Sequence, residues 1–229
     1  FQDFEIICSD NASTDKTVEI LEQISKTDKR IQVHKNESNL GPVRNWKNCL
    51  DHASGHYVHW LWSDDWIEPD FYIDAFALMG KDGTNVVTTW NYRSDNPDDN
   101  QDKYISWQFS HPTVPGHIAA KKILLLTGEL PVSPAAYILP IDSVRKNFFM
   151  NIPRLGALDP VTKGVGVDSL MVSGCCASET KISVLQKPSV VFRCHENISA
   201  VLARDGSLGR MYLMSHIWYM ATSHIPLTS

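Results

Sequence analysis

Three features are scarce in this sequence, and each absence argues against a class of protein. No run of apolar residues approaches the ~20 that a membrane-spanning helix needs, so we expect no such helix. The five cysteines are odd in number and lack the spacing of a disulfide framework, which indicates a reducing compartment. Basic residues are outnumbered, and the net charge of −5 argues against a protein that grips duplex nucleic acid through its phosphates.

The remaining composition is that of a folded protein. The 229 residues are enough for one large domain or two small ones, and the 43% that are hydrophobic can form a core. The charge is uneven: residues 1–110 hold 19 acidic and 10 basic side chains, whereas residues 111–229 hold 7 and 11. The acidic half suits a bound cation and the basic half an anionic ligand or surface, although a solvated surface explains either balance as well.

Strands and helices are expected to alternate over the first ninety residues. Apolar runs predict strands over residues 4–9, 31–34, 57–62 and 86–90. Between them, helical spacing predicts three helices, of which the second begins at Pro42. This alternation is typical of an open, mostly parallel α/β sheet flanked by helices. Beyond residue 94 we expect a helix over 117–127, strands within 136–139 and 184–194, and a mostly helical end.

The adjacent pair Asp64-Asp65 is the sharpest chemical feature. It follows the expected strand 57–62, which is apolar without alternation and therefore reads as central. Ligands of open α/β sheets bind beyond the carboxyl ends of the strands. Mg²⁺ or Mn²⁺ is held by one or two carboxylates together with phosphate oxygens. The pair therefore suits a metal–diphosphate site, and the alternative is an ordinary solvated turn.

Asp10 lies at the end of another expected strand. It is therefore expected to face the same ligand-binding crevice, beyond the carboxyl ends of the strands, as Asp64-Asp65. Its alternative role is to cap the helix that follows. Ser13, Thr14 or Asp15 could supply that cap instead.

The motifs together resemble a known family, the family-2-type inverting glycosyltransferases with the GT-A fold. The resemblance is strong over residues 4–75 and traceable through 131–134, Asp168 and His195. It rests on the following segments in family order: Phe4-Glu5-Ile6-Ile7, Asp10 to Thr17, Asn39-Leu40-Gly41, Arg44-Asn45, Ala53-Ser54-Gly55 and Asp64-Asp65. The first βα unit of the family is missing before residue 4, so the expected GT-A fold is N-terminally incomplete.

The resemblance implies a role for each matching donor-side residue. Asp10 would contact the base, expected to be uracil, and Arg44 would hold the nucleotide or its diphosphate. Asp64 would lie near the ribose and the metal, and Asp65 would be the principal ligand of Mn²⁺ or Mg²⁺. His195 resembles a histidine that reaches the diphosphate or the metal, and its alternative role is structural.

Asp168 matches the position of the catalytic base of the family. The family has an acidic residue just before it, whereas this chain has Val167. The alternative role of Asp168 is a plain helix N-cap.

The implied activity is transfer of a sugar from a nucleotide-diphosphate donor, expected to be a UDP-sugar, to an acceptor hydroxyl with inversion. The acceptor would be a saccharide or lipid-linked saccharide of a growing bacterial surface glycan. Residues 1–110 would form the donor and metal half, and residues 111–229 the acceptor half with the base and C-terminal helices. The alternatives are a sugar nucleotidyltransferase and a non-catalytic nucleotide- or sugar-binding module.

The expected location is cytoplasmic, with peripheral contact at the inner face of the membrane. The segment 208–220 has the aromatic and methionine content of an interfacial helix. The alternative is that this helix simply packs on the sheet.

Overall fold

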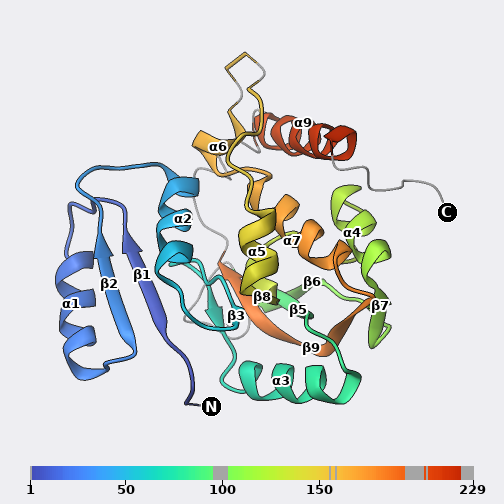
Figure 1. The fold of residues 1–229 in the computed structure, drawn as a ribbon, viewed down its shortest axis with the longest axis horizontal. Helices are drawn as coiled ribbons and strands as arrows, with labels where there is room; N and C mark the ends of the chain where they lie inside the picture. Colours follow the sequence, from blue (N-terminus) through green and yellow to red (C-terminus); the bar gives the residue numbers. More distant parts are fainter. Residues whose placement is uncertain are drawn as a thin grey trace.

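The computed structural model describes residues 2–94, 103–154, 156–157, 159–193, 204 and 206–222. Figure 1 shows a small β/α part, formed by the N-terminal elements, beside a larger layered part. Among the described residues, no helix is both long enough and apolar enough to cross a membrane.

The N-terminal part is a two-stranded parallel sheet. Strand β1 (Ile6–Asp10) pairs with β2 (Ile31–Lys35), so that Asp10 lies opposite Lys35 at the carboxyl edge. Helix α1 (Thr17–Thr27) connects them, and α2 (Pro42–His52) follows. Because the φ of Gly41 is +79° and Pro42 presets the first helical turn, α2 begins where the sequence predicts.

The larger part is built on a seven-stranded sheet. Its order is β3 (Tyr57–Val58), β8 (Tyr137–Pro140), β5 (Val87–Ser94), β9 (Lys181–Arg193) and β4 (Trp66–Ile67). Strand β6 (Lys103–Trp107) pairs with β5, and β7 (Thr113–Pro115) pairs with β9.

The expectation of a mostly parallel sheet is wrong in this part. Among the described pairings, only β1 with β2 and β5 with β9 are parallel, and the others are antiparallel. Strand β3 also lies at one end of the strand order rather than at its centre. An apolar run indicates that a strand is buried, but it does not indicate whether the neighbouring strands are parallel or antiparallel to it.

The sequence predicts a strand over residues 57–62, but β3 ends at Val58. Beyond Val58, side-chain contacts hold the chain in place and no β-sheet hydrogen bonds continue. Trp60 is in the core, and the His59 ring bonds to the Tyr72 hydroxyl at 2.9 Å and the Ala135 carbonyl at 2.8 Å.

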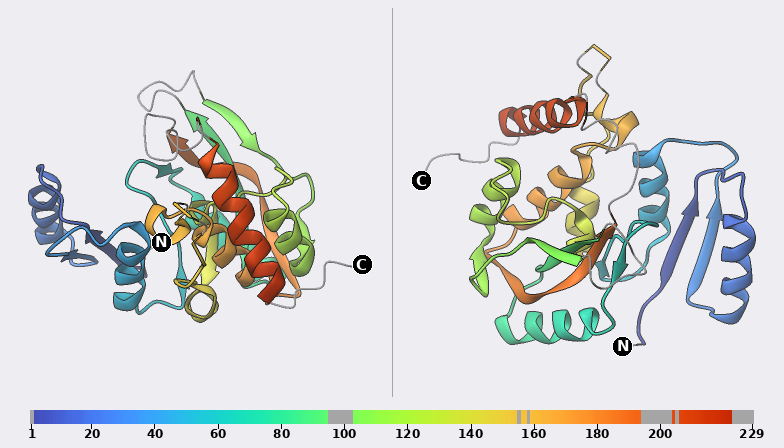
Figure 2. Two further views of the ribbon diagram at one scale, coloured as in Figure 1. Left: turned by 90° about the horizontal axis from the view of Figure 1, so that it is seen from above. Right: turned by 180° about the vertical axis from the view of Figure 1, so that it is seen from behind.

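Helices cover both faces of this sheet (Figure 1). Helix α3 lies on one face, whereas α4, α5 and α7 lie on the other and α9 lies over α7 (Figures 1 and 2). Their bounds, with the short η2 and α6, are α3 (Phe71–Asp82), α4 (Gly116–Leu124), η2 (Pro134–Ala136), α5 (Ile141–Asn147), α6 (Pro160–Lys163), α7 (Val167–Ala177) and α9 (Ser207–Thr222).

Helix α7 is the central helix of the larger part. Every residue from Val167 to Cys176 is buried, because α4, α5 and α9 all pack against it. A Cβ at Gly174 would lie 2.2 Å from Oδ1 of Asn147, so close packing against α5 requires glycine there. A helix held on all sides can position the residues at its start within narrow limits.

Candidate active site

The Asp10 side chain stabilises the polar turn that follows β1. The side chain is 6% exposed, and Oδ2 accepts a hydrogen bond from the Ser13 N–H at 3.0 Å. Asp15, and not Asp10, bonds to the first turn of α1: its carboxylate accepts a hydrogen bond from the Thr17 N–H at 2.9 Å. The alternative role of Asp10 as the cap of this helix is therefore wrong.

A network of amide side chains ties this turn to the start of α2. Asn45 accepts hydrogen bonds from Ser9 Oγ and from Asn36 Nδ2, both at 2.7 Å. Asn11 accepts from the Leu40 N–H at 2.8 Å and donates to Asn39 at 2.9 Å. The motif residues Asn39 and Asn45 thus connect three loops. The sequence places these amides in turns, but it does not reveal that they bond to one another.

Asp64 and Asp65 lie in the turn before β4 and are half-buried. Oδ1 of Asp65 accepts the backbone N–H of Arg193, the last residue of β9, at 3.1 Å. The pairing of Trp66 with Val191 brings these two ends together. His195 follows two residues later and lies outside the described residues, so its expected role is untested.

The carboxylates of Asp64 and Asp65 are suitable ligands for a hard divalent cation. Carboxylate oxygens are the protein ligands that Mg²⁺ prefers, and one or two of them suffice when phosphate oxygens complete the shell. Within the described ranges, no cluster of three or more His, Cys, Asp or Glu side chains could hold a metal alone. A cation at Asp64 and Asp65 would therefore depend on oxygens from a phosphorylated ligand.

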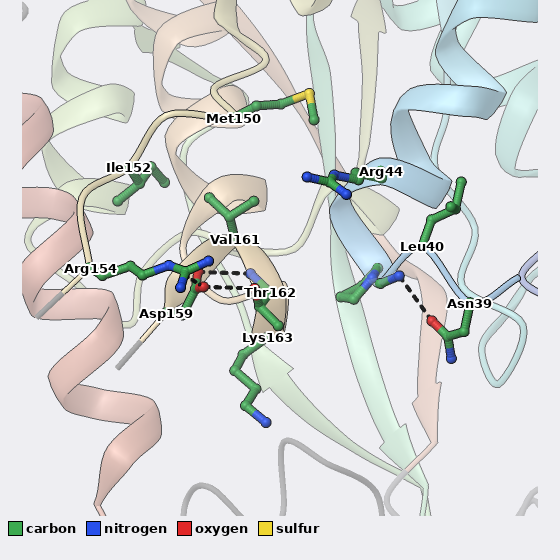
Figure 3. A pocket seen from close by; sticks show the side chains of 12 residues that line it. Asn39, Leu40, Arg44, Met150, Ile152, Arg154, Asp159, Val161, Thr162 and Lys163 are labelled. Atoms are coloured by element: carbon green, nitrogen blue, oxygen red, sulfur yellow. Dashed lines mark hydrogen bonds and ion pairs between the residues drawn. The ribbon is translucent and has the colours of Figure 1, made fainter. Parts of the chain in front are cut away.

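Arg44 lines a cavity of about 710 Å³ between the start of α2 and the segment around α6 (Figure 3). The guanidinium of Arg154 in this cavity bonds to Asp159 at 2.7 Å, whereas within the described residues Arg44 and Lys163 have no ion-pair partner. Two cations without an ion-pair partner among the described residues make this cavity suitable for an anionic ligand. Its lining residues are Asn39, Leu40, Gly41, Pro42, Arg44, Met150, Ile152, Arg154, Asp159, Val161, Thr162 and Lys163.

Asp168 is the second residue of α7 and is 9% exposed. Burial raises the pKa of its carboxyl from 3.8 to about 6, although hydrogen bonds from backbone N–H groups and from Tyr212 act in the opposite direction. Oδ1 has no hydrogen-bond partner among the described residues. Such a carboxylate is ionised at pH 7 and is a stronger base than an exposed aspartate.

The expected alternative for Asp168, a plain N-cap, is wrong. The N-cap of α7 is Gly166, with a φ of +85°, and no side chain caps the helix. Val167 is fully buried in one cluster with Val43, Leu170 and Tyr219. An acidic side chain here, as the family has, would be desolvated among these apolar residues, which accounts for the valine.

The mixed sheet with helices on both faces is the α/β architecture expected of the GT-A fold. The pattern of Glycosyl transferase family 2 matches residues 1–132, more than half of the chain. The chain therefore belongs to this family. The match contains Asp10, Arg44, Asp64 and Asp65, whereas Asp168 and His195 lie beyond it.

Known relatives agree with this assignment. An uncharacterized glycosyltransferase of Haemophilus influenzae is 33% identical over 106 residues, 46% of this chain and 42% of that protein. The GalNAc(5)-diNAcBac-PP-undecaprenol beta-1,3-glucosyltransferase of Campylobacter jejuni is 42% identical over 66 residues, 28% and 21% of the two chains. The chain thus spans less than half the length of these relatives.

A solved structure shares the fold. Residues 1–349 of S. aureus TarS, in complex with UDP-GlcNAc, match 85% of this chain and 50% of that chain with a TM-score of 0.64. The sequence identity is 22%, so this similarity establishes the fold alone.

Proposed function

We propose that this chain transfers a sugar from a UDP-sugar to a hydroxyl of a saccharide or lipid-linked saccharide acceptor, with inversion. The observation that carries the proposal is the family match over residues 1–132, which includes all four donor-side residues within the described structure. Relatives named for glycosyl transfer to an undecaprenol-linked saccharide and for teichuronic acid biosynthesis support a bacterial surface glycan as the product.

The donor is bound by residues 1–110. Asp10 contacts the uracil, and Arg44 neutralises the nucleotide or its diphosphate from the cavity beside α6. Asp64 would lie near the ribose and the metal, Asp65 would be the principal ligand of Mn²⁺ or Mg²⁺, and His195 would reach the diphosphate or the metal. When bound, the cation supplies Lewis-acid stabilisation of the leaving diphosphate.

The acceptor is bound by residues 111–229, which include the base. The acceptor oxygen forms a bond to the anomeric carbon as the bond from that carbon to the diphosphate breaks. Asp168 takes the hydroxyl proton, and the UDP leaves with the bonding electrons. A single displacement from the opposite face inverts the anomeric centre, and the raised pKa of Asp168 favours the proton transfer.

A turnover assay with UDP-sugars, Mn²⁺ and a saccharide acceptor tests this function. A product glycoside of inverted anomeric configuration, seen by proton NMR with release of UDP, supports the proposal. Release of pyrophosphate would instead identify a sugar nucleotidyltransferase, and UDP binding without any turnover of any acceptor would identify a binding module.

The chain acts at the cytoplasmic face of a membrane, in contact with anionic lipid through α9. This helix packs on α7 through Met211, Ser215 and Tyr219, yet Leu213 and Ile217 are 59% and 53% exposed. Because these two residues are four apart, they share one face of the helix. An exposed apolar stripe in the half with excess basic residues suits an anionic membrane surface.

Flotation with vesicles measures this contact. We expect the chain to float with anionic vesicles and the double variant Leu213→Ser, Ile217→Ser to remain at the bottom of the gradient. Ile73→Ser is the matched control, because Ile73 is 55% exposed on α3 in another part of the fold. The membrane contact would be disproved if the unaltered chain failed to float or if the double variant floated equally well.

A further inference from the structure

The cavity beside α6 has two walls that come from different parts of the chain. One wall is the start of α2, with Leu40 and Arg44, and the other is formed by described residues between Met150 and Lys163 (Figure 3). We call the second of these the α6 wall. The family match ends at residue 132, so it contains the first wall but not the α6 wall. The volume of about 710 Å³ is in the range of sites that enclose a whole small molecule.

Close packing holds the two walls against each other. A Cβ at Gly164, the residue after α6, would lie 2.9 Å from Cγ of Pro42 and 3.0 Å from Cη2 of Trp46. Gly164 also has a φ of +70°, so glycine is favoured there both for its size and for its backbone conformation. Asp168 follows Lys163 by five residues, so the same short connection carries the end of the α6 wall and the proposed base.

The α6 wall carries more positive charge than its own carboxylate neutralises. Asp159 accepts hydrogen bonds from the Thr162 N–H at 3.0 Å and from Thr162 Oγ1 at 2.7 Å, and Nε of Arg154 bonds to it at 2.7 Å. These contacts occupy both carboxylate oxygens. In the part of the chain that the structure describes, Lys163 has no ion-pair partner, and Arg154 bonds only through Nε. The net charge of the whole chain is −5, so this wall is a local concentration of positive charge.

We propose that the α6 wall binds an anionic group of the acceptor, a phosphate or a carboxylate, through Lys163 and the terminal nitrogens of Arg154. The inference rests on the proposed function in one respect, the assignment of residues 111–229 to the acceptor. In that function Arg44 serves the donor from the opposite wall, so the cations of the α6 wall remain for a second anion. Guanidinium and ammonium groups bind phosphate and carboxylate through charge-assisted hydrogen bonds. Leu40 and Met150, each 39% exposed, offer contacts to the uncharged part of the same ligand.

Binding in the absence of donor tests the inference. The probes are glucose 1-phosphate, glucuronic acid and glucose, which share a hexose ring and carry a phosphate, a carboxylate or no charge. We expect NMR titration of the nitrogen-15-labelled chain to show that a charged probe binds about 10-fold more tightly than glucose, because hydrogen bonds to charged groups are strong. The preference should decline at high salt. The tighter of the two charged probes identifies the anion. Equal affinity for all three probes, or no binding of any, would overturn the inference.

Substitution of Lys163 assigns the contact to the α6 wall. Lys163→Gln should lose most of the preference for the charged probe, and Lys163→Arg should retain it because the positive charge is restored. Lys146→Gln is the matched control, since Lys146 is an exposed lysine of α5 that does not line the cavity. A preference that persists in Lys163→Gln would contradict the inference.

Affinity for UDP in Mn²⁺ separates the acceptor from the donor. We expect Lys163→Gln to bind UDP as tightly as the unaltered chain does. A loss of UDP affinity in this variant would assign the α6 wall to the donor and overturn the inference. Failure of the proposed function is a different result, namely no sugar transfer by the unaltered chain to any acceptor, and it does not alter the binding measured without donor.

Discussion

Asp168→Asn is expected to bind the donor normally and to turn over at least ~10²-fold more slowly than the unaltered chain. Asparagine keeps the shape of the side chain and its ability to accept hydrogen bonds, but it cannot act as a base. The measurements are the affinity for UDP by calorimetry and kcat with a saccharide acceptor. Turnover close to that of the unaltered chain would dismiss Asp168 as the base.

The same variant should also be more stable at neutral pH. The folded carboxyl has a pKa of about 6, against 3.8 for the unperturbed group, so the native state binds more protons between these values. Stability from this group is therefore present below about pH 4 and lost as the pH rises to about 6. Asparagine avoids that loss, which is of the order of 2–3 kcal/mol.

Thermal melts at pH 4 and pH 8 check the second expectation. Asp168→Asn should melt at a higher temperature than the unaltered chain at pH 8, with a smaller difference at pH 4. Asp142→Asn is the control, because the Asp142 side chain is 94% exposed and should change neither turnover nor the pH dependence. If Asp168→Asn instead melted at a lower temperature than the unaltered chain at pH 8, removal of the buried charge would not have increased the stability, and this prediction would be wrong.

Asp65→Ala should weaken metal-dependent UDP binding by at least ~10²-fold, since changes to residues that merely support a metal ligand already weaken binding by up to that amount. Alanine also removes the acceptor of the Arg193 N–H. Asp65→Asn separates the two effects, because it retains that acceptor and removes the charge. The measurement is UDP affinity by calorimetry with and without Mn²⁺.

The control for this pair is Asp70→Ala. Asp70 is exposed, lies on the other side of β4 at the start of α3 and makes no side-chain cap to that helix. We expect its UDP affinity to match that of the unaltered chain, and both Asp65 variants to lose the response to Mn²⁺. If calorimetry showed equal affinity in Mn²⁺ for Asp65→Asn and the unaltered chain, the metal ligand would be misassigned.

Much of the fold could be predicted, but strand directions could not. The strands around Ile6, Ile31 and Val87 and the start of α2 at Pro42 lie where the pattern predicts them. The pattern could not predict that β8 and β4 run antiparallel to their neighbours, because the direction depends on which strands meet. Nor could it predict that Trp60 and Trp62 pack against the core, and that His59 bonds to Tyr72 and Ala135, without extending β3.

The sequence by itself determined the family of this protein and predicted its donor-side residues, whereas only the tertiary structure decided the environment of Asp168. Turn chemistry and hydrophobic period are local, so Asp10, Gly41 and Asp64-Asp65 can be recognised from their neighbours in the chain. The raised pKa of Asp168 arises from burial, because α4, α5 and α9 all pack against α7. Desolvation depends on contacts between distant segments, and these exist only once the chain has folded.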